Sequence, residues 1–488
     1  MKNGTNFNYN IPFENLRQWI DEAEKLGELR RVKGASWERD IGLATELLQH
    51  DENAPAALFD EIPGYPKGFR VLTNFFGATR QNMTLGFPTN LTKVELSNSF
   101  LEKYRDAVAN PIPHRVVNDG PVLENVLRGD DVDVLKFPTP KWHDEDGGRY
   151  IGTGSFNVTR DPVEGWINVG TYRVMVQDEK TVGFYISPGK HGRIHRQKYT
   201  EEDQPMPVCV VVGVDPLVFL MSSTEVPYGM CEYDVAGALR GKPLDVVIGE
   251  HTGLPFPAEA EIVLEGYCYP GKTRPEGPFG EWTGFYGSPV HEGPVIDVVQ
   301  IYHRNNPILL GCPPQRPPEE QARYRAVVRS ALLKEQLEQA GVPDVTAVWC
   351  HEVGGSRMLT GVSIKQRYPG HATQAGHIAA QCRVGGYAGK YVIVVDDDID
   401  VSSLEDLMWA ATFRSDPATS IDIIKDAWST PLDPSISPED KEAGNTTNSR
   451  AIIKACRPYH WRDKYPKVNM PSPEVWAEAK AKWGYLLK

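Results

Sequence analysis

Two glutamates flank a rigid turn in the stretch RPEGPFGEWTGFYG, residues 274–287. Glu276 and Glu281 lie on either side of the tetrapeptide GPFG, which cannot be helical because glycine and proline break a helix. Such a turn can hold both carboxylates inward beneath Phe279. Apolar cover raises the pKa of a carboxyl group, whereas a nearby arginine keeps its partner ionised. The pair is therefore a candidate acid and charged orienter, and a surface hairpin with solvated glutamates is the other interpretation.

Three further residues could bind a hard divalent cation. Asn168 lies in NVGTYRVMV with Arg173, His191 lies in SPGKHGRIH, and Glu232 lies in PYGMCEYDVAG. A mixed nitrogen and oxygen ligand set suits Mn²⁺ or Mg²⁺ better than structural zinc, which prefers thiolates. The spacing alone also fits a turn asparagine, a loop histidine with its own partner and a solvated glutamate.

The composition limits the classes of protein. The chain has 488 residues, so it exceeds the size of one core and we expect two or three domains. Its net charge of −13 argues against a nucleic-acid partner. No apolar run reaches membrane-helix length, and the start MKNGTNFNYN lacks a signal-peptide core. Seven scattered cysteines without a CxxC pair indicate reduced thiols. We expect a cytoplasmic, catalytic protein without a membrane segment.

Three zones of the sequence differ in their patterns. Residues 13–115 favour helices, with Leu16, Trp19, Ile20 and Ala23 at helical spacing. Residues 122–317 contain β-branched and aromatic runs, which predict a barrel or sandwich-like domain. These runs lie at 167–176, 180–187, 206–214, 260–269 and 294–303. From residue 318 onward, strand and helix patterns alternate, which predicts an α/β domain.

The third zone carries helix signals at its ends. A long helix over 318–341 should end at Gly341 as its C′ residue, since glycine adopts the left-handed conformation needed there. Ser402 and Glu405 form a predicted capping box. Near the end of the chain, Ser472 as N-cap predicts a terminal helix rich in Trp and Leu, which suits a dimer contact.

An ordered set of motifs resembles the UbiD-type decarboxylases that use prenylated FMN, in the branch that acts on aromatic and cinnamic acids. The motifs are INVGTYR, PGKH, LMSSTEVPYGMCEYDVAGALRG, AEIVLEGY, EGPFGEWTGFYG and VIVVDDDIDV. The resemblance spans nearly the whole chain. It implies an N-terminal α/β domain over 1–120, a flavin-reductase-like split β-barrel that binds the cofactor over 121–317, and a C-terminal α/β domain with the terminal helix over 318–488, which would mediate oligomerisation.

The same resemblance implies roles for particular residues. Asn168, His191 and Glu232 resemble the ligands of a divalent metal, Mn²⁺ or Mg²⁺, that holds the cofactor phosphate, and K⁺ is expected beside the backbone of Val169, Ser222 and Thr224. The implied cofactor contacts also include Thr171, Tyr172, Arg173, Lys190 and Ser223. Arg173, Glu276 and Glu281 resemble the family's catalytic network.

The implied reaction is reversible, non-oxidative decarboxylation of an aromatic, heteroaromatic or α,β-unsaturated acid. The substrate would form a covalent adduct with the cofactor, Arg173 would pair with the substrate carboxylate and Glu276, and Glu281 would supply the proton. A separate flavin prenyltransferase would provide the cofactor, and the chain would form a homodimer or higher homo-oligomer.

Alternative functions remain open. The first is 3-polyprenyl-4-hydroxybenzoate decarboxylation in ubiquinone biosynthesis, although that branch tends to carry Asp where this chain has Glu281. Another is a plain FMN oxidoreductase, which would not need the acid pair. A glycosidase would leave the predicted metal ligands unused, and a non-catalytic binding module fits this length least well. We expect the substrate pocket to involve parts of residues 312–321 and the C-terminal domain.

Overall fold

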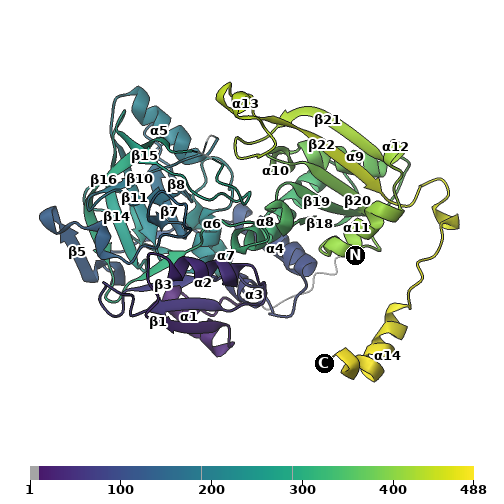
Figure 1. Cartoon of the computed structure of the whole chain (residues 1–488), viewed down its shortest axis with the longest axis horizontal. Coiled ribbons are helices and arrows are strands. Elements are labelled where there is room, and N and C mark those ends of the chain that lie inside the picture. The colour runs from purple at the N-terminus through teal and green to yellow at the C-terminus, as the bar shows by residue number, and fades with distance from the viewer. Residues whose placement is uncertain (1–9, 188, 288, 488) are drawn as a thin grey trace.

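A computed structural model describes residues 10–187, 189–287 and 289–487 (Figure 1). Pro188 of the PGKH motif, the polar start of the chain and Lys488 lie outside the described residues. Three larger sheets organise the chain: a four-stranded sheet near the N-terminus, an eight-stranded sheet in the middle and a five-stranded sheet in the C-terminal part. The structure is therefore of the mixed α/β, multidomain class that the sequence predicts.

The N-terminal sheet has the order β1-β2-β3-β17. Its strands are β1 (Leu29–Lys33), β2 (Ala56–Asp60), β3 (Arg70–Thr73) and β17 (Ile308–Gly311). The helices are α1 (Leu16–Lys25), α2 (Asp40–Gln49), α3 (Ala78–Leu85) and α4 (Lys93–Ala109). The predicted apolar face of α1 is confirmed, since Leu16, Trp19, Ile20 and Ala23 are all buried. Strand β17 pairs in parallel with β3, so a segment from late in the chain completes this sheet.

The middle sheet is antiparallel, with the order β10-β16-β14-β11-β7-β8. These strands are β10 (Thr181–Gly183), β16 (His291–His303), β14 (Ile262–Cys268), β11 (Met206–Val212), β7 (Ser155–Arg160) and β8 (Ile167–Gly170). Strands β5 (Asn125–Arg128) and β15 (Thr273–Glu276) also pair with β16. Among the described strand pairs, β10 and β8 do not join, so no closed barrel is formed.

Strand β11 shows why the sequence of residues 206–212 is continuously apolar. Val208 and Val210 pack into one hydrophobic cluster, whereas Cys209 and Val211 pack into another. Successive side chains of a strand point to opposite faces, so both faces of β11 are buried. The predicted strand over 167–176 is interrupted instead: β8 ends at Gly170 and β9 (Val174–Met175) pairs with β6 (Tyr150–Gly152). Residues 171–173 therefore lie in an irregular segment between two sheets.

The C-terminal sheet has the order β18-β19-β20-β22-β21, with a parallel centre and antiparallel edges. Its strands are β18 (Val345–Cys350), β19 (Leu359–Ile364), β20 (Tyr391–Asp396), β22 (Thr447–Ala455) and β21 (Ile421–Trp428). Helix α8 (Glu320–Gln339) runs between this domain and the middle sheet (Figure 1). Gly341 follows it with φ 81°, as predicted.

The predicted capping box at Ser402 and Glu405 is wrong by one residue. Helix α11 (Leu404–Phe413) has Ser403 as its N-cap, and the Ser403 side chain accepts a hydrogen bond from the backbone N–H of Asp406. Ser402 instead donates to Asp400 at 2.7 Å. Two adjacent serines each satisfied the sequence pattern, and the local turn at Asp400 decided between them.

The remaining elements are short and connect these sheets. A small sheet contains β4 (Arg115–Val116), β12 (Asp245–Ile248) and β13 (Pro255–Pro257). The connecting helices are α5 (His191–Glu201), α6 (Pro216–Ser222), α7 (Glu232–Arg240), α9 (His371–Gln381), α10 (Arg383–Gly386), α12 (Pro417–Ser420) and α13 (Pro438–Glu442).

The terminal helix α14 (Pro473–Trp483) is present as predicted, with Ser472 as its N-cap. It lies at the end of an extended segment, away from the body of the molecule (Figure 1). Trp476 and Trp483 on this helix are about half exposed. None of the helices among the described residues is both long and apolar enough to cross a membrane.

Candidate active site

The structure brings Arg173, Glu276 and Glu281 together. The Arg173 guanidinium donates two hydrogen bonds to the Glu276 carboxylate, from Nε at 2.9 Å and from Nη2 at 2.6 Å. Its remaining nitrogen, Nη1, donates to Glu281 Oε1. All three side chains are about nine-tenths or more buried. A paired arginine of this kind is rigid, so the cluster can present both charge and a proton at a fixed position.

Three segments supply these side chains. Arg173 comes from the irregular segment between β8 and β9, and Glu276 is the last residue of β15. Glu281 lies in the connection between β15 and β16, where its backbone N–H bonds to the carbonyl of Phe285 at 3.0 Å. The predicted tight hairpin around GPFG is therefore wrong: the strands flank the whole segment 277–290. Both glutamates nevertheless point inward, and Phe279 is 3% exposed beside them.

Aromatic side chains hold this cluster in place. The Tyr150 hydroxyl donates to Glu276 Oε1 at 3.0 Å, and the Tyr150 ring lies 4.0 Å from that of Phe279. The Arg173 guanidinium lies over the Tyr185 ring at 4.1 Å. Gly277 has φ 88°, a conformation that favours glycine, and it turns the chain directly after Glu276. The residues between the two glutamates are thus packed against Tyr150 and fix the positions of both carboxylates.

Burial and pairing set the charges of the cluster. Burial raises the pKa of Glu281, and the Arg173 guanidinium opposes this shift. Burial by itself would lower the pKa of Arg173, but Glu281 and Glu276 outweigh it and raise that pKa. Burial and the neighbouring Glu276 carboxylate raise the pKa of Tyr150, so its hydroxyl keeps the proton that it donates. Glu281 is thus an acid poised beside a permanent cation.

The predicted metal ligands converge on a second part of the middle domain. Asn168 Nδ2 donates to the Tyr172 hydroxyl at 3.2 Å, and the same hydroxyl accepts from the backbone N–H of Gly192, beside His191, at 3.0 Å. Glu232 accepts from the backbone N–H of Val169 at 2.7 Å. One small region therefore contains the segments of all three predicted ligands.

Among the described residues, Glu232 lacks a cationic partner. Its side chain is buried, and no ion pair joins it to a described lysine, arginine or histidine. Burial raises the pKa of Glu232 to about 8, because the ionised form has no compensating positive charge. A divalent cation would supply that charge, and the amide oxygen, imidazole and carboxylate fit such an ion. The residues present therefore fit the predicted metal.

The other predicted cofactor residues surround this region. The backbone N–H of Thr171 bonds to the Ser222 carbonyl at 3.2 Å, which joins the segment after β8 to the end of α6. The hydroxyls of Ser223 and Thr224 donate to the carbonyl of Leu220. The bond between Thr171 and Ser222 therefore places the end of α6 next to the segment that follows Asn168.

Lys190 and Arg383 meet on one carboxylate. Lys190 Nζ lies 2.9 Å from Glu225 Oε1, and Arg383 Nη2 lies 3.5 Å from Glu225 Oε2. Lys190, as the largest influence, lowers the pKa of Glu225 to about 2. Another lysine of the C-terminal domain, Lys390, pairs with a different carboxylate, that of Asp433, at 2.7 Å. The predicted contact Lys190 thus borders the C-terminal domain as well as the metal region.

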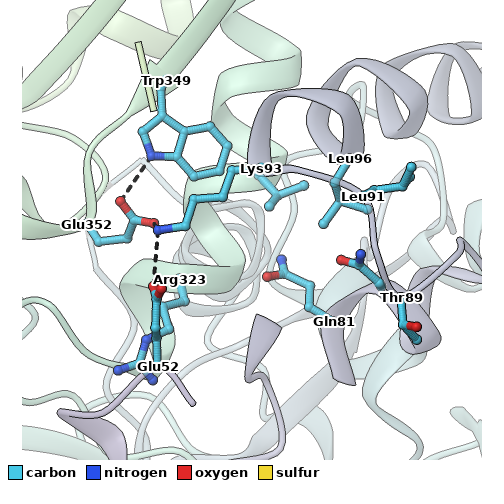
Figure 2. Close-up of a pocket in the computed structure, with 11 residues that line it drawn as sticks. Glu52, Gln81, Thr89, Leu91, Lys93, Leu96, Arg323, Trp349 and Glu352 are labelled. Carbon is cyan, nitrogen blue, oxygen red and sulfur yellow. Dashed lines mark hydrogen bonds and ion pairs between the residues drawn. The ribbon is translucent and has the colours of Figure 1, made fainter. Parts of the chain in front are cut away.

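Two other polar clusters have structural explanations. In the cavity between α4 and α8, Lys93 bridges Glu52 at 3.1 Å and Glu352 at 3.2 Å (Figure 2). Its ammonium is therefore compensated from both sides. At the start of α7, His114 Nδ1 bonds to Asp234 Oδ1 at 2.8 Å. Both clusters join neighbouring elements by pairs that are already complete.

Sequence reasoning missed the residues that support the acid pair. Tyr150 contacts Glu276 from 126 residues earlier in the chain, whereas Tyr185 contacts Arg173 across a local antiparallel bridge. The segment RYIGTG around Tyr150 carries no catalytic motif. Only the fold brings these side chains together, so no sequence signal could have found them.

Family models match most of the chain. Residues 20–97, 114–317 and 324–455 match the N-terminal, Rift-related and C-terminal domains of 3-octaprenyl-4-hydroxybenzoate carboxy-lyase. A phenolic acid decarboxylase of Sedimentibacter hydroxybenzoicus is 34% identical over 91% of this chain and 92% of its own. A pyrrole-2-carboxylic acid decarboxylase of Pseudomonas aeruginosa is 32% identical over 91% of each chain.

Solved structures show the same fold over almost the entire length. The UbiD-class enzyme HmfF from Pelotomaculum thermopropionicum in complex with FMN has a TM-score of 0.84 at 29% identity, covering 95% of this chain and 99% of that one. An evolved dimeric form of HmfF in complex with prFMN has a TM-score of 0.81 at 28% identity, covering 95% and 98%.

Proposed function

Because the chain belongs to the UbiD family of carboxy-lyases, we propose that it catalyses reversible, non-oxidative decarboxylation of an aromatic, heteroaromatic or α,β-unsaturated acid with prenylated FMN. The observation that carries this proposal is the buried Arg173 held between Glu276 and Glu281. A plain flavin oxidoreductase has no use for an acid pair on an arginine.

Decarboxylation at an sp² carbon needs an electron sink that no side chain offers. Prenylated FMN supplies that sink when bound, and the protein supplies position, charge and a proton. Arg173 would bind the substrate carboxylate, and a charge-assisted hydrogen bond of this kind contributes ~1.5–3 kcal/mol. Glu276 and Tyr150 would keep the guanidinium in place, since they hold it and each other by hydrogen bonds.

The charge balance explains the role of Glu281. With both glutamates ionised, the cluster with Arg173 has a net negative charge and would repel a substrate carboxylate. Protonation of Glu281, which accepts a hydrogen bond from Arg173 Nη1, makes the cluster neutral and removes the repulsion. Substrate binding therefore favours the protonated form of Glu281, which burial already favours. The same proton would pass to the carbon that loses CO₂.

Asn168, His191 and Glu232 would hold Mn²⁺ or Mg²⁺ at the cofactor phosphate. The uncompensated Glu232 carboxylate supports this assignment. Backbone carbonyls of Val169, Ser222 and Thr224 would hold K⁺. The remaining cofactor contacts would be Thr171, Tyr172, Arg173, Lys190 and Ser223.

We also propose the finer features that the family resemblance implies. The open middle sheet would be the split barrel, with domain boundaries near residues 120 and 317. A flavin prenyltransferase would supply the cofactor. The seven cysteines are all free thiols, which supports a reducing compartment, the cytoplasm. The chain would form a homo-oligomer through α14, because Trp476 and Trp483 on this helix are about half exposed in a single chain. Light scattering on a variant truncated at residue 466 tests this, and we expect the oligomer to be lost.

A substrate screen tests the proposed reaction. Protein co-produced with a flavin prenyltransferase is incubated with a panel of aromatic, heteroaromatic and cinnamic acids, together with 4-hydroxybenzoates that carry a polyprenyl chain. We expect CO₂ release from members of the first group. CO₂ release from the polyprenylated acids alone would assign the ubiquinone branch instead, and flavin-dependent oxidation without CO₂ would contradict the proposal.

A further inference from the structure

The side-chain amide of Asn168 is held in one orientation. Both N–H bonds of its Nδ2 are used, one on Thr159 Oγ1 and the other on the Tyr172 hydroxyl, each at 3.2 Å. None of the described residues donates a hydrogen bond to the other end of the amide, Oδ1. Asn168 is buried, so an amide turned by half a rotation would exchange these two ends without help from bulk water. The partners of Nδ2 therefore decide which atom is available to a metal.

The sheet places Thr159 directly beside Asn168. The two residues are partners across the antiparallel strands β7 and β8. Side chains at such positions lie on the same face of a sheet, with their Cβ atoms ~4.5–5.5 Å apart. Thr159 is fully buried, so the direction of its hydroxyl depends on its protein partners.

A buried histidine of α5 is the second partner of this hydroxyl. Thr159 Oγ1 lies 3.0 Å from His195 Nδ1, and His195 Nε2 faces Asp161 Oδ2 at 3.6 Å. The ammonium of Lys198 pairs with the same Asp161 oxygen at 2.5 Å, which favours an ionised carboxylate. That carboxylate favours the tautomer of His195 with its proton on Nε2. Burial lowers the pKa of His195 to about 4, so the ring is neutral near neutral pH and Nδ1 is an acceptor.

These contacts set the direction of each hydrogen bond as far as Asn168. With His195 Nδ1 as the acceptor, the Thr159 hydroxyl donates its only proton to the histidine. The hydroxyl oxygen can then only accept from Asn168, and an amide oxygen at that position would be repelled. The amide must therefore present Nδ2 to Thr159, which leaves Oδ1 for a cation.

We propose that Thr159 and His195 are positioning residues that hold the Asn168 amide with its oxygen toward the divalent metal. This inference rests on the proposed function, because it takes Asn168 as a metal ligand. Thr159 acts on Asn168 directly, and His195 acts through Thr159. Of the two histidines one turn apart on α5, His191 would bind the metal and His195 would fix the orientation of another ligand. Residues that orient a metal ligand contribute roughly 10–100-fold to metal affinity.

Two replacements of Thr159 test this role without requiring turnover. Thr159→Val keeps the shape and removes the hydroxyl, whereas Thr159→Ser keeps the hydroxyl and removes a methyl group. Mn²⁺ is titrated into the flavin-loaded protein, and the free ion is measured by electron paramagnetic resonance. We expect Thr159→Val to weaken Mn²⁺ binding roughly 10–100-fold and Thr159→Ser to stay within about threefold of the native protein. A role in packing alone would give the opposite order, because only Thr159→Ser leaves a cavity.

A second variant and a control complete the comparison. His195→Phe keeps an aromatic ring beside Trp166, whose ring lies 4.6 Å from that of His195, but it removes the acceptor Nδ1. The Thr159 hydroxyl could then donate to the amide oxygen, so Mn²⁺ binding should weaken in the same range. The control is Thr45→Val, which removes the hydroxyl of a fully buried threonine in the N-terminal domain that donates to the Ile41 carbonyl at 2.7 Å. It should leave Mn²⁺ binding unchanged.

The outcomes separate the positioning role from the proposed reaction. Native Mn²⁺ affinity in Thr159→Val would overturn the role, as would equal losses in Thr159→Val and Thr45→Val. If Thr159→Val does not fold, His195→Phe decides in the same way. CO₂ release from an accepted acid is measured on the same native sample. The expected difference between the two Thr159 variants without CO₂ release contradicts only the proposed reaction, and CO₂ release with native Mn²⁺ affinity in Thr159→Val contradicts only the positioning role.

Discussion

Replacing Glu281 by glutamine separates proton donation from binding. The amide is nearly isosteric with the carboxyl group, and its oxygen can still accept the hydrogen bond that Arg173 Nη1 donates. Glu276 keeps its two hydrogen bonds from Arg173, so the guanidinium stays in place. We therefore expect Glu281→Gln to retain the fold, the flavin and the metal.

The expected loss is in the rate constant and not in substrate affinity. A general acid contributes ~10²–10⁴ in rate, so kcat should fall by that factor. KM should stay constant or fall. Substrate binding requires a neutral side chain at position 281, and the amide of the variant is always neutral. Glu276→Gln is the matched control: it loosens the guanidinium, and it should therefore raise KM as well as lower kcat.

Solvent deuterium gives the sharper readout. Product formed by the native protein in D₂O should carry deuterium at the carbon that held the carboxylate, and a product analogue should exchange that hydrogen slowly. Glu281→Gln should abolish the exchange, while changes in the flavin spectrum on substrate addition persist. A loss of kcat smaller than tenfold, or undiminished exchange, would refute the role of Glu281 and make Glu276 the next candidate.

Three further predictions follow from the buried charges. Glu232→Ala should lose Mn²⁺ and most of the flavin, as should His191→Ala; full metal and flavin content in purified variants would contradict the assignment. Arg173→Lys should keep the fold but lose turnover, because an ammonium cannot replace the two-pronged contact with Glu276; near-normal kcat would mean that only charge matters. Burial lowers the pKa of His143, but the carboxylates of Asp146 and Glu46 outweigh burial and raise this pKa to about 9. Since this folded-state pKa is raised, the stabilisation is fully present below about pH 6.5 and is lost as pH rises through 9. His143→Gln should therefore lower the melting temperature at pH 6 and not at pH 10; a pH-independent difference would contradict this.

Local elements of the fold were predictable because their signals are local. Leu16, Trp19 and Ile20 recur at helical spacing in the sequence, and all three are buried on one face of α1. Gly341 adopts the left-handed conformation that ends α8. Ser402 and Ser403 mark the limit of such signals, since both residues satisfy the capping pattern and the choice depends on a turn at Asp400.

Long-range features of the fold were not predictable. Strand β17 joins the N-terminal sheet by pairing with β3, more than 200 residues earlier in the chain. No periodicity within β17 specifies that partner, because a buried strand of this kind fits any sheet with two covered faces.

The candidate site divides in the same way. Arg173, Glu276 and Glu281 were identified from motifs and do meet in the structure. The shape of the turn between the glutamates was wrong, because GPFG packs as a wedge against Tyr150 instead of forming a tight hairpin. Tyr150 is visible in the sequence only as one aromatic residue, and its contact with Glu276 emerges from the three-dimensional arrangement.

Reconstitution with two flavins tests the central claim most directly. The protein freed of flavin is loaded either with FMN or with prenylated FMN, together with Mn²⁺ and K⁺, and given an accepted acid labelled with ¹³C in its carboxyl group. We predict labelled CO₂ in equal amount to the decarboxylated product from the protein loaded with prenylated FMN, and none from the protein loaded with FMN. Equal release from both, or no release from fully loaded protein with any acid of the panel, would contradict the account.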